Sequence, residues 1–174
     1  MITTRRTVLA AVVATSVVGA TAGVALVAMP TAIRRDLPPL RALDPASASI
    51  LAAVADVVCP GGDGLPTATE IGVVGRVDAL LASMHPGAVA DFTSLLGLLE
   101  SALFGLLLDG RPRPFSACDP AQRAAGLERW RTSRIPERRT GYRALHGLVS
   151  GAYWSHPAVF PHTGYPGSPF AVSG

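Results

Sequence analysis

Apolar side chains recur at helical spacing through most of the chain beyond residue 44. The spacing predicts helices over residues 46–58, 70–84, 88–108, 121–131 and 136–152. Asp44-Pro45 and Asp119-Pro120 each place an N-cap residue before a proline at the first helical position, which is typical of a helix start. No alternating apolar and polar run of useful length predicts a strand. The pattern therefore predicts an all-α fold, a bundle of about five helices.

Residues 88–108 form the most apolar of these segments. Leucines occupy nearly every side of the expected helix, so we expect it to be the buried central helix of the bundle. Asp91 and Glu100 interrupt the apolar run. We therefore do not interpret it as a membrane span.

Residues 7–29 make another apolar run, which carries no charge. As a helix it would extend about 35 Å, enough to cross a hydrocarbon core of about 30 Å. Arg5 and Arg6 stand directly before it, and this is the arrangement of a twin-arginine export leader. Such a leader is read by the twin-arginine translocase, which moves proteins across the membrane already folded.

A simple membrane anchor over residues 7–29 is the alternative. Arg34, Arg35 and Arg41 follow the run, so the positive-inside rule leaves its orientation undecided. We expect an exported chain, in the periplasm or on the outer face of the cytoplasmic membrane, with the run as its membrane contact if it is not removed. The expected organisation is a leader or anchor over residues 1–35, a helical domain over 36–152 and a tail over 153–174.

The tail combines prolines with aromatic residues. Five of the ten aromatic residues of the chain lie within residues 153–170, spaced by four prolines. Prolines favour extended structure, and aromatic rings need a surface to bury against. Either the tail is an extended arm that binds a partner, or it wraps its own bundle. In the first case the expected anchors are Tyr153, Trp154, His156, Phe160 and Tyr165.

Charge is unevenly distributed along the chain. Residues 36–109 hold nine acids and two arginines, whereas residues 110–143 hold nine arginines and three acids. This asymmetry either steers a partner, or lets the two halves attract each other, or is simply solvated. The net charge of +3 belongs largely to the N-terminal arginines and does not indicate nucleic-acid binding.

Cys59 and Cys118 are the two cysteines of the chain. In an exported protein such a pair suggests a disulfide, which would close a loop of about 60 residues and stabilise the fold by about 3–4 kcal/mol. The alternative is two free thiols, because export through the twin-arginine route follows folding in the cytoplasm.

Candidate chemistry is sparse in this sequence. It holds no HExxH motif, no GxSxG, no Walker sequence and no CxxCH haem motif. His156 and His162, six residues apart in the tail, are the remaining candidates for a metal-binding protein or a membrane-anchored helical enzyme. A stand-alone structural protein of the cell envelope is a further alternative.

Two stretches of the sequence resemble a known family. The first runs from Leu51 to Pro60 and continues as Leu65-Pro-Thr-Ala-Thr-Glu-Ile-Gly-Val-Val74. The second is Gly151-Ala-Tyr-Trp-Ser-His-Pro157 followed by Gly164-Tyr-Pro-Gly167. Together they resemble the gluconate 2-dehydrogenase subunit 3 family, the small subunits of membrane-bound dehydrogenases, over roughly residues 44–169.

The resemblance implies that this chain is not itself catalytic. Such small subunits bind a large FAD-containing oxidoreductase of the glucose–methanol–choline (GMC) type that lacks its own leader, and they carry it through the twin-arginine pathway as a folded pair. Electrons pass from the flavin to a cytochrome c subunit or another acceptor. The implied cofactors are therefore FAD, and in some complexes haem c, in partner subunits. Sugars, aldonates, polyols or glycosides are the implied substrates.

Overall fold

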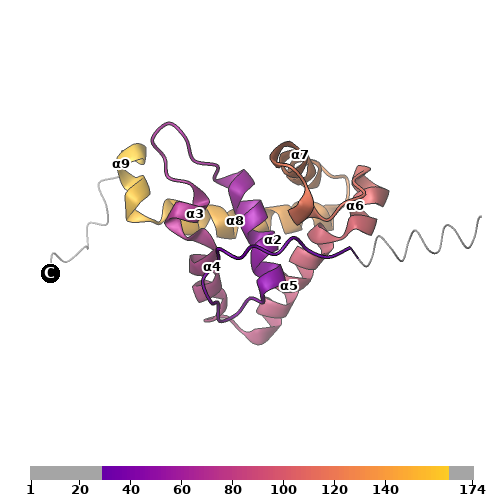
Figure 1. Ribbon diagram of the computed structural model, residues 1–174, viewed down its shortest axis with the longest axis horizontal. Coiled ribbons are helices and arrows are strands. Elements are labelled where there is room, and N and C mark those ends of the chain that lie inside the picture. Colours follow the sequence, from indigo (N-terminus) through magenta and orange to yellow (C-terminus); the bar gives the residue numbers. More distant parts are fainter. Residues whose placement is uncertain (1–28, 165–174) are drawn as a thin grey trace, which may run out of the picture.

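The computed structural model describes residues 29–164, and over this part of the chain the fold is all-α, as predicted (Figure 1). Within residues 29–164 the only β pairing is an isolated bridge between Gly62 and Leu65 in a loop. The elements in chain order are α2 Pro45–Val58, α3 Ala68–Ile71, α4 Val73–Leu81, α5 Pro86–Glu100, α6 Ala102–Asp109, η1 Phe115–Ala117, α7 Pro120–Arg131, α8 Pro136–Trp154, η2 Pro157–Val159 and α9 Phe160–Thr163.

The predicted helix starts are confirmed in atomic detail. Oδ1 of Asp44 accepts hydrogen bonds from the N–H groups of Ala46 and Ser47, and Pro45 opens α2. Asp119 forms a capping box with Gln122 at the start of α7. Each cap supplies an acceptor to backbone N–H groups that have no partner within the helix.

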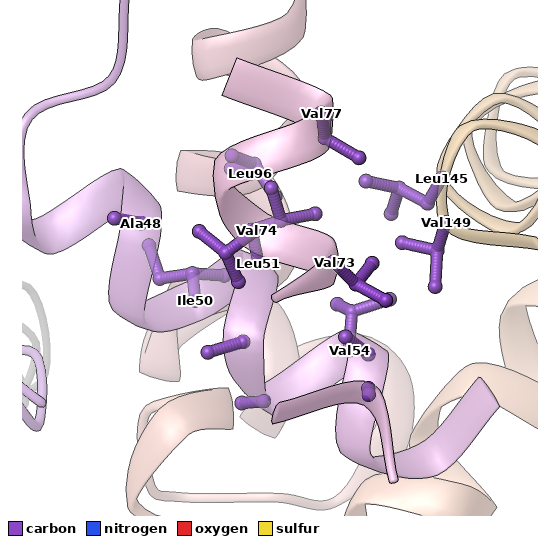
Figure 2. Close-up of a cluster of buried hydrophobic side chains, with 14 of the residues drawn as sticks. Ala48, Ile50, Leu51, Val54, Val73, Val74, Val77, Leu96, Leu145 and Val149 are labelled. Carbon is purple, nitrogen blue, oxygen red and sulfur yellow. The ribbon is translucent and has the colours of Figure 1, made fainter. Parts of the chain in front are cut away.

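The central helix of the bundle is α2, so the prediction that residues 88–108 would be central is wrong. Every residue of α2 from Ser47 to Ala55 is buried. Figure 2 shows its apolar side chains meeting those of α4, α5 and α8 in one cluster; the labelled members are Ala48, Ile50, Leu51, Val54, Val73, Val74, Val77, Leu96, Leu145 and Val149. Small residues such as Ala48, Ala52 and Ala55 let the surrounding helices approach α2 on all sides.

Two predicted helices are each broken into two. The segment 70–84 is interrupted at Gly72, whose left-handed φ of +69° ends α3 before α4 begins. The segment 88–108 is interrupted at Ser101, where α5 and α6 meet at 61°. Oγ of Ser101 accepts a hydrogen bond from the N–H of Phe104 and so caps α6.

The break at Ser101 bears on membrane insertion. Among residues 29–164, no single helix is both long and apolar enough to cross a bilayer, and the bent pair α5–α6 qualifies only when its two halves are taken together.

The tail is not extended between residues 153 and 164, which corrects the prediction for this part. Helix α8 continues through Trp154, and two short helical turns, η2 and α9, follow. Pro157 and Pro161 lie in the first turns of these elements, where the missing N–H costs no hydrogen bond. The prolines therefore start helical turns here instead of preventing them.

Residues 29–44 form an irregular segment that crosses in front of α2 (Figure 1). The N–H of Arg34 donates to Oγ of Ser49 at 2.9 Å. Further along the segment, the carboxylate of Asp78 accepts the N–H groups of Arg41, Ala42 and Leu43 at 2.8–2.9 Å. Asp78 thereby fixes the approach of the segment to α2.

We expect Asp78 to make the stability of the fold depend on pH. Burial opposes the charge of its carboxylate, but the three N–H donors outweigh burial, and the pKa of Asp78 lies below its usual value. Its contribution is therefore complete above the unfolded-state pKa of about 3.9 and is lost as pH falls through the lower folded-state pKa.

Replacing the carboxylate isolates this contribution. We expect Asp78→Asn to lower the free energy of unfolding by about 1.5–3 kcal/mol at neutral pH, since its hydrogen bonds are charge-assisted. Urea unfolding of both proteins over a pH series measures the difference. A difference that stays constant below pH 4 would contradict this role of Asp78.

Candidate partner-binding surfaces

The C-terminal end of α8 was predicted to carry anchors for a partner, but Tyr153 is not one of them. Its side chain is 2% exposed, and its hydroxyl donates to the carbonyl oxygen of Pro66 at 2.6 Å. Burial raises the pKa of Tyr153 above its usual value, so the phenol stays protonated as this donor. Tyr153 therefore ties α8 to the loop before α3 and belongs to the core of the domain.

The side chain of Trp154, unlike that of Tyr153, is exposed at the surface. It is 47% exposed, and its ring meets that of Tyr153 edge to face with centroids 5.1 Å apart. The two residues are neighbours at the end of α8, where successive side chains point about 100° apart, so burying one leaves the other outside. Trp154 therefore stays half-exposed while its ring packs against a buried tyrosine.

The other predicted anchors differ in their surroundings. Nδ1 of His156 accepts the N–H of Ala158 and caps η2. Phe160 is half-buried at the start of α9. Tyr165 lies outside the described residues. The exposed aromatic surface at this end of the domain is therefore centred on Trp154.

A shallow groove lies between α4 and α8 on the same side of α8 as Trp154. Its volume is about 260 Å³, and its lining residues are Arg76, Leu80, Gly147, Leu148, Gly151, Ala152 and Ser155. Gly147, Gly151 and Trp154 follow one another at helical spacing along α8. Space is open where a Cβ atom would stand at either glycine. We call this surface, together with Trp154, the α4–α8 groove.

Arg76 fixes the floor of the groove. Its Nε donates to the carbonyl oxygen of Ala152 at 3.0 Å, and one terminal nitrogen donates to Oγ of Ser155 at 3.0 Å. A cation at the C-terminal end of α8 also compensates the negative end of the helix dipole. These contacts of Arg76 tie α4 to the C-terminal end of α8 beside the groove.

A second apolar surface lies at the opposite end of the long axis of the domain, around α6 (Figure 1). Because α6 turns away from α5 at Ser101, its large side chains face outward, and Leu107 is 71% exposed. We call this surface the α6 face; its exposed members are Leu98, Phe104, Leu107, Leu108 and Ile135. A pocket of about 210 Å³ opens beside Leu107, and its lining includes the other four of these residues together with Trp130 and Arg138.

The α6 face rests on a buried ion pair. One terminal nitrogen of Arg138 donates to both carboxylate oxygens of Asp109, the last residue of α6, at 2.8 Å. Both side chains are at most 9% exposed, and the guanidinium also stacks over Trp130 at 5.3 Å. This pair holds the end of α6 against α8.

Gly105 allows Arg111 to pack closely against α6. A Cβ atom there would lie 2.8 Å from the backbone oxygen of Arg111. Arg111 folds back under α6 and donates to the carbonyl oxygen of Leu99 at 2.9 Å. The exposed leucines of α6 are thus carried on a firmly held helix.

Comparison with known proteins identifies the family of this chain. Residues 45–167 match the family described as gluconate 2-dehydrogenase subunit 3. The chain belongs to the gluconate 2-dehydrogenase subunit 3 family. Neither the curated proteins nor the solved structures gave a match. Membership in this subunit family agrees with a role as one subunit of a dehydrogenase complex.

The match in the subunit 3 family runs from α2 through α9 and includes both surfaces. The two sequence stretches that resemble the family meet in space, since the hydroxyl of Tyr153 in the second binds the carbonyl of Pro66 in the first. Within the first, Thr67 and Glu70 form the capping box of α3, and Gly72 takes the left-handed conformation that ends it. The resemblance therefore rests on residues that shape the fold.

The disulfide suggested for Cys59 and Cys118 is absent from the structure, where both are buried free thiols. The thiol of Cys118 donates to the carbonyl oxygen of Pro114 in the turn before α7. Cys59 ends α2, and burial raises the pKa of its thiol to about 11. Each thiol is enclosed in its own surroundings, and that of Cys59 is protonated near neutral pH.

The histidines suggested as metal ligands are not gathered into a site. Over residues 29–164, no group of three or more His, Cys, Asp or Glu side chains is arranged to hold a metal ion. His162 lies near the loop glycine Gly64, where a Cβ atom would stand 3.2 Å from its ring. His156 caps η2, as described above.

Proposed function

We propose that this chain is the non-catalytic small subunit of a membrane-associated, FAD-dependent dehydrogenase. It escorts a folded GMC-type flavoprotein subunit through the twin-arginine pathway and stabilises that subunit outside the cytoplasm. The flavin in the partner oxidises a sugar, aldonate, polyol or glycoside. The electrons pass on to a cytochrome c subunit or another acceptor.

One combination of observations carries the proposal: a subunit 3 domain over residues 45–167 that follows Arg5, Arg6 and an uncharged apolar run. The leader supplies an export address for proteins that are already folded. Membership in a family of dehydrogenase subunits indicates that the folded protein exported with this chain is a dehydrogenase subunit.

The roles of the described ionisable groups support a structural subunit. Asp78 and Glu100 accept backbone N–H groups, Asp109 binds Arg138, and His156 caps a helical turn. These groups hold elements of the fold together, as expected of a domain that serves another protein.

The α4–α8 groove is the surface we assign to the flavoprotein. It is preformed, it carries an exposed tryptophan, and its glycines let a partner backbone approach α8 closely. Of the two aromatic residues that end α8, we assign the anchor role to Trp154 alone, because Tyr153 is buried in the core.

We expect Trp154→Ala to weaken association with the flavoprotein subunit by about 2 kcal/mol, or about thirtyfold in Kd. Folding should change little, because the indole is half-exposed in the free domain. Titration of the tagged chain with its flavoprotein measures the affinity, and thermal melting checks the fold. The matched control is Ile135→Ala, an exposed apolar residue at the other end of α8, which should leave the affinity unchanged.

Co-expression with a GMC-type flavoprotein from the same genome tests the function as a whole. The tagged chain should bring down a yellow protein with dehydrogenase activity, and the same chain expressed alone should be colourless and inactive. A chain that binds flavin and oxidises substrate by itself would overturn the proposal.

A further inference from the structure

The point at which the described chain begins lies beside the start of α6. The N–H of Ala32 donates to Oγ of Ser116 at 2.9 Å. The same hydroxyl donates at 2.6 Å to the carboxylate of Glu100, the last residue of α5, and the backbone N–H of Ser116 donates to it at 2.8 Å. The apolar run of residues 7–29 therefore joins the domain at the end that carries the α6 face.

Arginines outnumber acids around this apolar face, although Glu137 also lines its pocket. The pocket of the α6 face shares Asp109 and Arg111 with a polar pocket of about 440 Å³ that Arg113 and Arg129 also line. Arg134 directly precedes Ile135 of the face. Within residues 29–164 the ion pairs leave Arg113, Arg129 and Arg134 without an acidic partner.

We propose that the α6 face binds the surface of an anionic membrane. Phe104, Leu107 and Leu108 enter the boundary between headgroups and acyl chains, and the surrounding arginines bind lipid phosphates. This combination of an apolar helix side and a basic border is the chemistry of a membrane-surface contact. Where the run at residues 7–29 is retained, this contact is a second attachment of the chain to the membrane.

The position of the α6 face favours a bilayer over the flavoprotein as the partner that it binds. An apolar run that enters the membrane and joins the domain at Ala32 brings the neighbouring α6 face close to the headgroups. The α4–α8 groove lies along the C-terminal half of α8, a helix of 19 residues that extends about 28 Å. The domain is thus an adaptor with the membrane at one end and the flavoprotein at the other.

A fluorescent probe at one exposed residue tests this contact in the full chain. Leu107→Cys is labelled with an environment-sensitive dye, and the chain is reconstituted without flavoprotein into vesicles of phosphatidylcholine and phosphatidylglycerol that contain nitroxide-labelled lipid. Leu80→Cys, at the α4–α8 groove and also exposed, is the matched control. The buried native thiols, with the pKa of Cys59 at about 11, remain unlabelled.

We expect the lipid nitroxides to quench the probe at residue 107 several times more strongly than the probe at residue 80. Each arginine near an anionic surface contributes about fivefold in binding, so Arg129→Gln with Arg134→Gln should reduce the quenching at residue 107. Equal, weak quenching at both positions would overturn the proposal. So would a probe at residue 107 that leaves water only when the flavoprotein is added, since the α6 face would then be a protein interface.

Discussion

Replacing Arg5 and Arg6 by lysine is expected to leave both this chain and its flavoprotein subunit in the cytoplasm. Lysine keeps the charge before the apolar run of residues 7–29, so a plain membrane anchor would still insert. The twin-arginine route reads the arginine pair itself. The expected loss of exported dehydrogenase activity is therefore nearly complete.

The matched control uses another adjacent pair of arginines, Arg34 and Arg35, which follow the apolar run. Lysine at these two positions should leave export unchanged. Cell fractionation with an immunoblot for each subunit, together with activity outside the cytoplasm, measures the result. Full activity outside the cytoplasm in the Arg5→Lys, Arg6→Lys variant would remove the escort role.

Breaking the buried ion pair under α6 is expected to have the largest effect on stability. Asp109→Ala would leave the guanidinium of Arg138 buried without its carboxylate, and Nε of Arg138 already has no hydrogen-bond partner. Loss of one member of such a pair costs about 3–5 kcal/mol. That loss is a large part of the stability of a domain of this size.

Two further variants separate the charge from the packing. Replacing both partners by apolar residues, Asp109→Leu with Arg138→Met, should restore much of the stability, because no uncompensated charge then remains. Glu128→Ala breaks the exposed pair with Arg131 and should leave the stability unchanged. Chemical denaturation measures all three variants. Similar losses for Asp109→Ala and Glu128→Ala would contradict the importance of the buried pair.

Helix starts could be predicted from the sequence because their chemistry is local. Asp44 and Asp119 cap helices within three residues of themselves, and proline at the first helical position needs no distant partner. The all-α fold followed from the same local signals. The family followed from short stretches that set a capping box, a left-handed glycine and the Tyr153 contact.

The bend at Ser101 could not be predicted by periodicity. Leucines continue through residue 101 without a change in spacing, and no proline or glycine stands there. The helix stops where Glu100 is bound by Ser116, and Arg111 reaches the carbonyl of Leu99. These contacts come from residues 12 and 16 positions away, so hydrophobicity alone wrongly predicted one buried helix.

The sequence by itself determined the helical class, the family and the presence of a leader-like segment, because caps, prolines and charge runs act over a few residues. Only the tertiary structure decided which surfaces remain exposed. It placed α2 at the centre, turned the leucines of α6 outward, and buried Tyr153 while leaving Trp154 outside. Exposure depends on which helices cover which faces, and that arrangement is fixed by contacts between residues far apart in the chain, such as the 87 positions that separate Tyr153 from Pro66.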